Sequence, residues 1–130
     1  MKREGIAHVE LSALVARLGH TDRFVVADAG LPVPRAVPFV DLALGGGKLD
    51  FRSVLDALLD EVVVQAHLVA DELTTSPAAA WLAERAHRMG ERSSVSHERF
   101  KELLPGVAFV VRTGERTPYA NVLLECGVPF

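Results

Sequence analysis

The stretch Leu18–Pro34, LGHTDRFVVADAGLPVP, decides the fold of this chain. Its four consecutive apolar residues, Phe24–Ala27, are typical of a strand that is buried on both faces of a sheet. Such a strand predicts helices on both faces, and therefore a layered α/β domain. The stretch also carries His20 before the strand and Asp28 directly after it. A histidine and a carboxylate on one rigid element suit acid–base chemistry on a small polar molecule.

Helix and strand patterns alternate on either side of this stretch. Apolar spacing predicts helices over residues 11–18, 51–59, 77–89 and 97–104, and strands over residues 24–27, 37–42, 62–70, 92–95, 107–112 and 121–124. Within the strand at 62–70, strict alternation places Val64, Ala66 and Leu68 on one face. The pattern predicts a three-layer α/β/α fold with a mixed sheet of about six strands, in one domain over residues 1–130.

Three polar residues are expected to begin helices. Asp50 and Ser96 each precede an apolar helical pattern, where a side-chain oxygen can accept the first free backbone N–H groups. Ser76 has the same position before Pro77, which suits the first helical residue.

Composition restricts the function classes. Hydrophobic residues make up 49% of the 130 residues and the mean hydropathy is +0.22, so we expect neighbouring subunits to cover part of the surface. The net charge of −3 is spread over interleaved acidic and basic residues, which argues against a nucleic-acid partner. No apolar stretch approaches the roughly 20 residues that span a bilayer. We expect no membrane partner and no secretory signal at Met1–Gly5. One cysteine, Cys126, suits a reducing compartment such as the cytoplasm.

His20 and Asp28 each have a functional and a structural interpretation. A histidine with an unperturbed pKa of about 6.5 is a usable acid or base at neutral pH. His20 also follows a predicted helix, whose C-terminus favours a cation. Asp28 follows four apolar residues, so its carboxylate must be paired or hydrogen-bonded. It either receives backbone N–H groups in the turn toward Gly30 or binds a sugar hydroxyl.

Two further groups of polar residues lie at element boundaries. His97 and Lys101 are one helical turn apart and share a helix face, which is either a binding face or a solvated one. Tyr119–Ala120–Asn121 enters the last predicted strand and offers a phenol, an amide and backbone groups. Its alternative interpretation is a turn. Asp71–Glu72 is interpreted as a solvated strand end.

Several other chemistries lack their motifs. Gly45–Lys48 is no phosphate loop, because Leu49 stands where the motif needs serine or threonine. The five histidines show no metal-ligand spacing, so we expect no metal. Cys126 lies beside a strand that contains Leu123 and Leu124, and is interpreted as a buried apolar residue rather than a nucleophile.

Three segments resemble the D-ribose pyranase family, the ribose-specific branch of the RbsD/FucU sugar mutarotases. They are LGHTDRFVVADAGLPVP (18–34), SHERFK (96–101) and RTGERTPYANVLLECGVPF (112–130). Their order and spacing are similar to those of the family, and the likeness extends from end to end. Asp28–Pro32 and Tyr119–Asn121 favour the ribose branch over the L-fucose mutarotases. Residues 37–92 match only in pattern.

The resemblance implies interconversion of the β-pyranose and β-furanose forms of D-ribose without a cofactor. It further implies that His20 is the catalytic acid and that the sugar is bound by Asp28, His97, Lys101, Tyr119, Ala120 and Asn121. Homo-oligomeric rings are also implied, as pentamers or decamers with sites between adjacent subunits.

The implied chemistry suits the residues. Opening a pyranose needs a proton on the ring oxygen, which we expect from His20. Asp28 orients either the sugar or the imidazole, and the group that accepts the anomeric proton is left open. The alternatives are an L-fucose-type mutarotase, a non-catalytic ribose-binding module and a structural ring-former.

Overall fold

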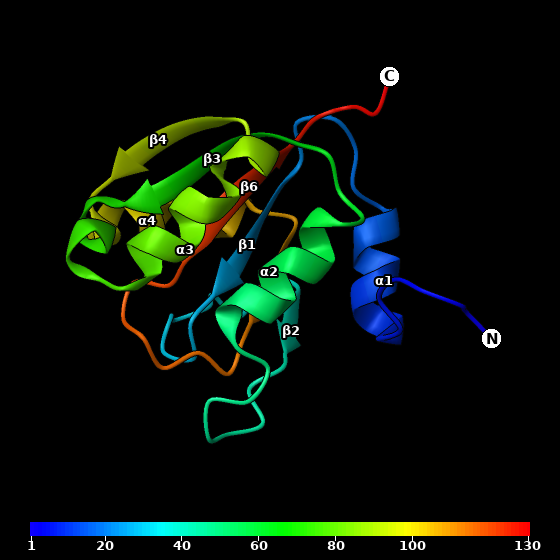
Figure 1. The fold of residues 1–130 in the computed structure, drawn as a ribbon, viewed down its shortest axis with the longest axis horizontal. Helices are drawn as coiled ribbons and strands as arrows, with labels where there is room; N and C mark the ends of the chain where they lie inside the picture. Colours follow the sequence, from blue (N-terminus) through cyan, green and yellow to red (C-terminus); the bar gives the residue numbers. More distant parts are fainter.

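A mixed six-stranded sheet organises the molecule (Figure 1). The computed structural model describes all 130 residues, Met1–Phe130. The strands are β1 (Arg23–Ala27), β2 (Phe39–Asp41), β3 (Val64–Ala70), β4 (Glu91–Val95), β5 (Phe109–Arg112) and β6 (Val122–Cys126). They lie in the order β2-β5-β1-β6-β3-β4, and β6 alone runs antiparallel to its neighbours. The predicted mixed sheet is confirmed.

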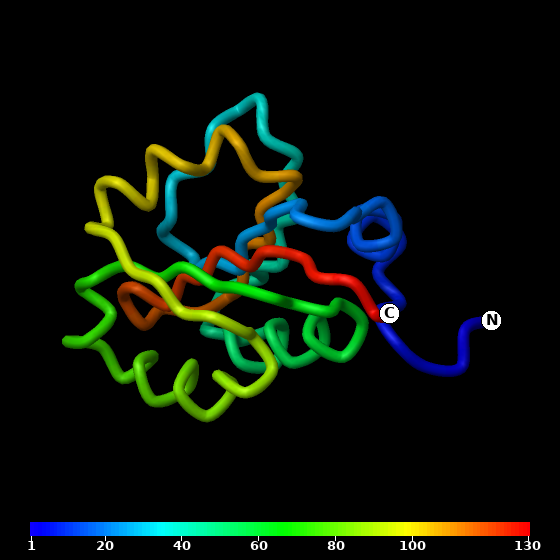
Figure 2. Tube along the Cα trace, turned by 90° about the horizontal axis from the view of Figure 1, so that it is seen from above, coloured from blue at the N-terminus to red at the C-terminus, as the bar shows by residue number.

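Four helices cover the sheet in two layers. They are α1 (Val9–Ala16), α2 (Phe51–Leu59), α3 (Ala78–Arg85) and α4 (His97–Leu103). Apolar residues of α1, α2 and α3 pack against one face of the sheet, and α4 with the segment Leu31–Val37 packs against the other. Figure 2 shows the sheet between these two layers. The three-layer α/β/α prediction is therefore confirmed.

Strand β1 lies at the centre of the sheet, as its apolar run predicts. Phe24 to Ala27 are fully buried, and the Phe24 ring stacks on Phe109 of β5 with 5.1 Å between centroids. Burying a large apolar side chain contributes about 1.5–3 kcal/mol. This strand therefore anchors His20 and Asp28 at its two ends to the most rigid part of the fold.

The predicted helix starts lie closer to the observed ones than the predicted helix ends do. The carboxylate of Asp50 accepts the Ser53 N–H at 2.8 Å, and the hydroxyl of Ser96 accepts the Arg99 N–H at 3.1 Å, so these two predicted caps are confirmed. The third is wrong in position: the N-cap of α3 is Pro77, although the Ser76 hydroxyl accepts the Ala78 N–H at 3.2 Å. The helix predicted over residues 77–89 is shorter. Its α-helical part is α3, which begins after Pro77 and gives way to a tighter 3₁₀ turn at Ala86–Arg88, as helix termini often do.

The predicted alternation along β3 is wrong. The register against β6 shifts between Val64 and Ala66, so Gln65 is an extra residue, a β-bulge. Val64 therefore shares a core with Val69, whereas Leu68 packs on the opposite face. The bulge lies at a close backbone approach. Gly90, with φ +65°, lies so near that a Cβ on it would be 1.9 Å from the Gln65 carbonyl oxygen.

A bidentate ion pair joins α2 and α3. Arg85 Nε and Nη2 donate to the two carboxylate oxygens of Asp56 at 2.6 and 2.7 Å. The hydrogen bond with Arg85 lowers the pKa of Asp56. Bidentate geometry makes this pair more directional than an ordinary surface ion pair. None of the helices is long and apolar enough to cross a membrane.

Candidate active site

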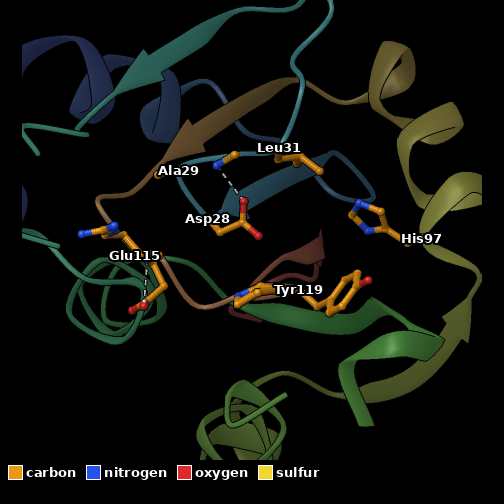
Figure 3. Close-up of a pocket in the computed structure, with 9 residues that line it drawn as sticks. Asp28, Ala29, Leu31, His97, Glu115 and Tyr119 are labelled. Carbon is orange, nitrogen blue, oxygen red and sulfur yellow. Dashed lines mark hydrogen bonds between the residues drawn. The ribbon is translucent and has the colours of Figure 1, made fainter. Parts of the chain in front are cut away.

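A cavity of about 380 Å³ opens where the parallel strands end (Figure 3). Asp28 follows β1, Glu115 follows β5, and His97 follows β4. Tyr119 comes from the start of β6, because that strand runs the other way. Ligands of open α/β sheets usually bind at this edge. The lining residues are Asp28, Ala29, Gly30, Leu31, His97, Glu115, Arg116, Pro118 and Tyr119.

Asp28 is held by the buried amide of Asn121. Asn121 Oδ1 accepts the Asp28 backbone N–H at 2.9 Å, and its Nδ2 donates to Asp28 Oδ2 at 2.9 Å. The other carboxylate oxygen accepts the Gly30 N–H, also at 2.9 Å. Both interpretations of Asp28 therefore have a structural basis: the carboxylate is fixed by a turn, and it faces the cavity (Figure 3). The Asn121 side chain is fully buried, and its polar atoms bond to Asp28.

His97 and Tyr119 form another wall of the cavity. Their rings meet edge to face with 5.2 Å between centroids, and Figure 3 shows the tyrosine ring pointing toward the imidazole. The Nδ1 atom of His97 is buried and has no hydrogen-bond partner within the chain. Tyr119 has φ +63°, a left-handed conformation that costs a non-glycine residue about 1–2 kcal/mol. Strain of this kind is found mainly where function requires a fixed geometry.

Two carboxylates outside the predicted set of site residues fix the walls of the cavity. Glu72, interpreted from sequence as solvated, accepts the His97 backbone N–H at 2.8 Å and so secures the start of α4. Glu115 Oε1 accepts the N–H groups of Arg116 and Thr117, both at 3.0 Å. Burial opposes ionisation of Glu115, but these backbone donors prevail and its pKa is lowered.

Lys101 and Ala120 lie outside the lining of the cavity. Lys101 is one turn beyond His97 on α4, and its ammonium pairs with Glu98 at 2.6 Å. Ala120 is fully buried in the core beside the cavity. Within one chain the structure thus brings Asp28, His97 and Tyr119 together, with Asn121 directly behind Asp28.

His20 is separated from these residues by the full length of β1. Five strand residues span roughly 16 Å, at about 3.3 Å per residue. His20 instead lies in a mainly apolar groove of about 420 Å³. The groove is formed by the end of α1, by Val63 before β3, and by the last residues of the chain, among them Val128 and Phe130. Its Nε2 is 3.1 Å from Oε1 of Gln65. Asp28 therefore does not orient the imidazole of its own chain.

Gln65 and Glu125 complete the surroundings of His20. Gln65 Nε2 donates to Glu125 Oε1 at 2.8 Å, so the amide bridges the carboxylate and the imidazole. No sequence pattern predicts this bridge, because it depends on the bulge at Gln65. The one signal in the sequence is that Gln65 is the single amide in a strand whose other residues, apart from His67, are apolar.

Comparisons with known proteins support the same family throughout the chain. The model of the RbsD / FucU transport protein family matches residues 1–129. A protein named D-ribose pyranase from Cutibacterium acnes is 53% identical, and one from Geobacillus thermodenitrificans is 46% identical. These alignments cover 100% of this chain, and 100% and 99% of the two relatives.

Solved structures of other proteins share the fold of this chain. The structure of Bacillus subtilis RbsD complexed with D-ribose is 42% identical over 100% of both chains, with a TM-score of 0.94. A fucose mutarotase from Streptococcus pneumoniae, in complex with L-fucose, shares the fold at 19% identity and a TM-score of 0.78, with 100% of both chains covered. The chain therefore belongs to the RbsD/FucU family.

Proposed function

We propose that this chain is a D-ribose pyranase, an isomerase that interconverts β-D-ribopyranose and β-D-ribofuranose without a cofactor. The observation that carries the proposal is the cavity around Asp28, His97 and Tyr119, in a fold that matches a ribose-bound relative over its whole length. A cavity of about 380 Å³ suits a small polar ligand. The higher identity to the ribose relatives favours ribose over L-fucose as the substrate.

The cavity residues hold the sugar hydroxyls. The Asp28 carboxylate accepts hydrogen bonds from two hydroxyls, and Asn121 keeps it in position. The unpartnered nitrogen of His97 supplies a further polar contact, because a buried polar atom without a partner is costly until a ligand satisfies it. Tyr119 contributes its phenol. Ala120, Asn121 and Lys101 lie outside the lining of the cavity in one chain, and their direct contact with the sugar rests on the family resemblance.

The catalytic acid is His20 of an adjacent subunit. The distance along β1 prevents one chain from placing His20 and Asp28 on the same sugar. The groove around His20 is apolar, and Val63 and Phe130 within it are 45% and 100% exposed, so a second copy could cover them. A closed ring, a pentamer or a decamer of two pentamers, would place one chain's His20 beside the next chain's cavity.

Acid–base catalysis accounts for the reaction. The His20 imidazolium protonates the ring oxygen, the bond from C1 to that oxygen breaks, and the bonding electrons remain on the oxygen. The anomeric hydroxyl gives its proton to a water or to Asp28, and C1 becomes an aldehyde. The O4 hydroxyl then attacks C1 and returns a proton to His20, while the carbonyl oxygen regains one. Atoms and charge balance, and a positioned acid typically contributes about 10²–10⁴-fold.

Saturation-transfer NMR tests the proposed activity. The exchange between ribose ring forms is measured with and without the protein, and we expect clear acceleration by the native chain. His20→Ala should remove about 10²–10⁴-fold of it, whereas His87→Ala, at an exposed histidine, should change nothing. Ribose binding without acceleration would identify a binding module, and acceleration of fucose alone would identify the other branch.

Mixing two inactive variants tests the shared site. His20→Ala and Asp28→Ala subunits are combined in equal amounts and allowed to reassemble. If each site takes His20 from one chain and Asp28 from its neighbour, about one quarter of the sites regain both residues. If no activity returns although mixed rings form, the site lies within one chain and the two-subunit proposal is wrong.

The cellular location follows from the same proposal. The one cysteine, Cys126, is a buried free thiol, and burial raises its pKa to about 11. A fold that needs no disulfide and carries an unreactive thiol suits a reducing compartment. We place the protein in the cytoplasm.

A further inference from the structure

We propose that Gln65 and Glu125 are positioning residues that fix the tautomer of His20 and leave Nδ1 to exchange the proton with the sugar. This inference rests on the proposed function, in which His20 is the acid. It starts from the bridge already described: Glu125 accepts from the Gln65 amide, and the amide contacts His20 Nε2.

The carboxylate determines which way the amide faces. An ionised carboxylate only accepts hydrogen bonds, so the NH₂ group of Gln65 must face Glu125. The amide oxygen then faces His20, as the 3.1 Å contact between Oε1 and Nε2 records. Because that oxygen accepts as well, Nε2 must carry a hydrogen in both charge states of the ring. Nδ1 is therefore the nitrogen whose proton comes and goes during catalysis.

The backbone holds both partners of this contact. Gln65 is the extra residue of the bulge, and Gly90 packs directly against its carbonyl oxygen. His20 lies in a turn in which the Asp22 N–H donates to the Gly19 carbonyl at 3.1 Å. Thr21 in that turn has φ +68°, unusual for a β-branched residue. These constraints fix the imidazole relative to the amide.

The other titratable groups around His20 do not contact its ring. Asp22 Oδ2 accepts the Gly19 N–H at 2.8 Å, and Glu61 accepts the Ile6 N–H. The Cys126 thiol is neutral at pH 7, because burial raises its pKa to about 11. Arg23 lies opposite Glu125 in the sheet and forms no ion pair with it. Gln65 is thus the one side chain of this chain that is hydrogen-bonded to the imidazole.

A neutral amide at Nε2 suits an acid that must release its proton near neutral pH. A carboxylate in the same place would stabilise the imidazolium and hold the proton more tightly. The amide orients the ring without that effect. Glu125, which contacts the amide and not the ring, fixes the orientation of the amide.

NMR of the ¹⁵N-labelled imidazole tests the tautomer without any substrate. In the native protein we expect neutral His20 to carry its hydrogen on Nε2 alone. Glu125→Gln allows the amide to flip, so a mixture of tautomers should appear, whereas Glu84→Gln, at an exposed carboxylate on α3, should leave the spectrum unchanged. A native His20 protonated on Nδ1 in its neutral form would overturn the proposal, whether or not ribose is a substrate.

Steady-state kinetics test whether Gln65 supports proton transfer by His20. Gln65→Leu should lower kcat by roughly fivefold to tenfold, the value of one hydrogen bond, with KM nearly unchanged because Gln65 acts through His20 and is not one of the proposed sugar-binding residues. Gln65→Glu restores an acceptor at Nε2, so kcat should recover while the alkaline limb of its pH profile moves to higher pH. A loss in KM alone, or an unmoved pH profile in Gln65→Glu, would refute the positioning role. Absence of ribose exchange in the native protein would refute the proposed function instead and leave the tautomer result intact.

Discussion

The two ends of strand β1 hold their functional residues in different ways. At the carboxyl end, Asp28 faces its cavity and is fixed by the fully buried amide of Asn121. At the amino end, His20 is exposed, lies in the apolar groove and is held by the exposed amide of Gln65. The side chain that supports Asp28 is therefore buried within the chain, whereas the side chain that supports His20 becomes buried only when another surface covers it. A binding function suits the end with the buried support, and a proton-transfer function suits the end that is covered on assembly.

Gly90→Ala should disturb the surroundings of His20 at the amino end of β1 and cause the largest loss of stability among these variants. The added Cβ would lie 1.9 Å from the Gln65 carbonyl oxygen, and the residue has φ +65°. We expect a loss of more than about 2 kcal/mol in the free energy of unfolding, together with a lower kcat. Urea denaturation measures the first effect. Gly106→Ala is the control, because its Cβ would meet open space; equal losses in the two variants would contradict the bracing role of Gly90.

Asn121→Ala should loosen the carboxyl end. It leaves the Asp28 N–H without its partner, at a cost of about 1–3 kcal/mol, and KM for ribose should rise because Asp28 is no longer held. Gln65→Ala is the matched change at the exposed end, and should alter stability by less than about 0.5 kcal/mol. If Gln65→Ala proves the more destabilising of the two, the contrast between the ends is wrong.

Thr21→Gly should separate stability from activity at the amino end. The left-handed conformation of Thr21, φ +68°, costs about 1–2 kcal/mol, and glycine removes that cost while adding about 0.5–1 kcal/mol of chain entropy. Thermal unfolding should therefore show an unchanged or slightly higher Tm. The turn becomes more mobile, so kcat should fall. A clearly lower Tm would show that the threonine side chain stabilises the turn.

His67 should make stability, rather than chemistry, depend on pH. It is 3% exposed, its Nδ1 bonds the Met89 carbonyl at 3.0 Å, and burial lowers its pKa below the ordinary 6.5. The unfolded chain therefore binds a proton at a higher pH than the folded chain, so stability falls as the pH drops below about 6.5 and is unaffected above it. Denaturation at about pH 7.5 and 5.5 measures the difference. His67→Gln should reduce the difference, and His87→Gln, at an exposed ring, should not.

The local signals in the sequence predict most elements. Phe24–Ala27 predicts the central strand, and Asp50 and Ser96 predict helix starts, because each depends on neighbours along the chain. The bulge at Gln65 is packed against Gly90, a residue 25 positions away, and no local pattern reveals it. The same limit applies to the site. Asp28, His97 and Tyr119 lie near predicted element boundaries and meet as expected. The sequence also places His20 and Asp28 at opposite ends of one strand, whereas the contact of Gln65 with His20 depends on the bulge and is not predicted.

Strand β6 has a consequence for how the chain folds during synthesis. It pairs with β1 on one side and β3 on the other, so it joins two parallel groups, β2-β5-β1 and β3-β4, into one sheet. It also follows every other strand along the chain. On the ribosome, the two groups remain unjoined and their edges open until residues 122–126 emerge. Exposed edges of this kind are prone to pair with other chains, so the nascent protein is expected to depend on rapid release or on chaperones until that last strand inserts.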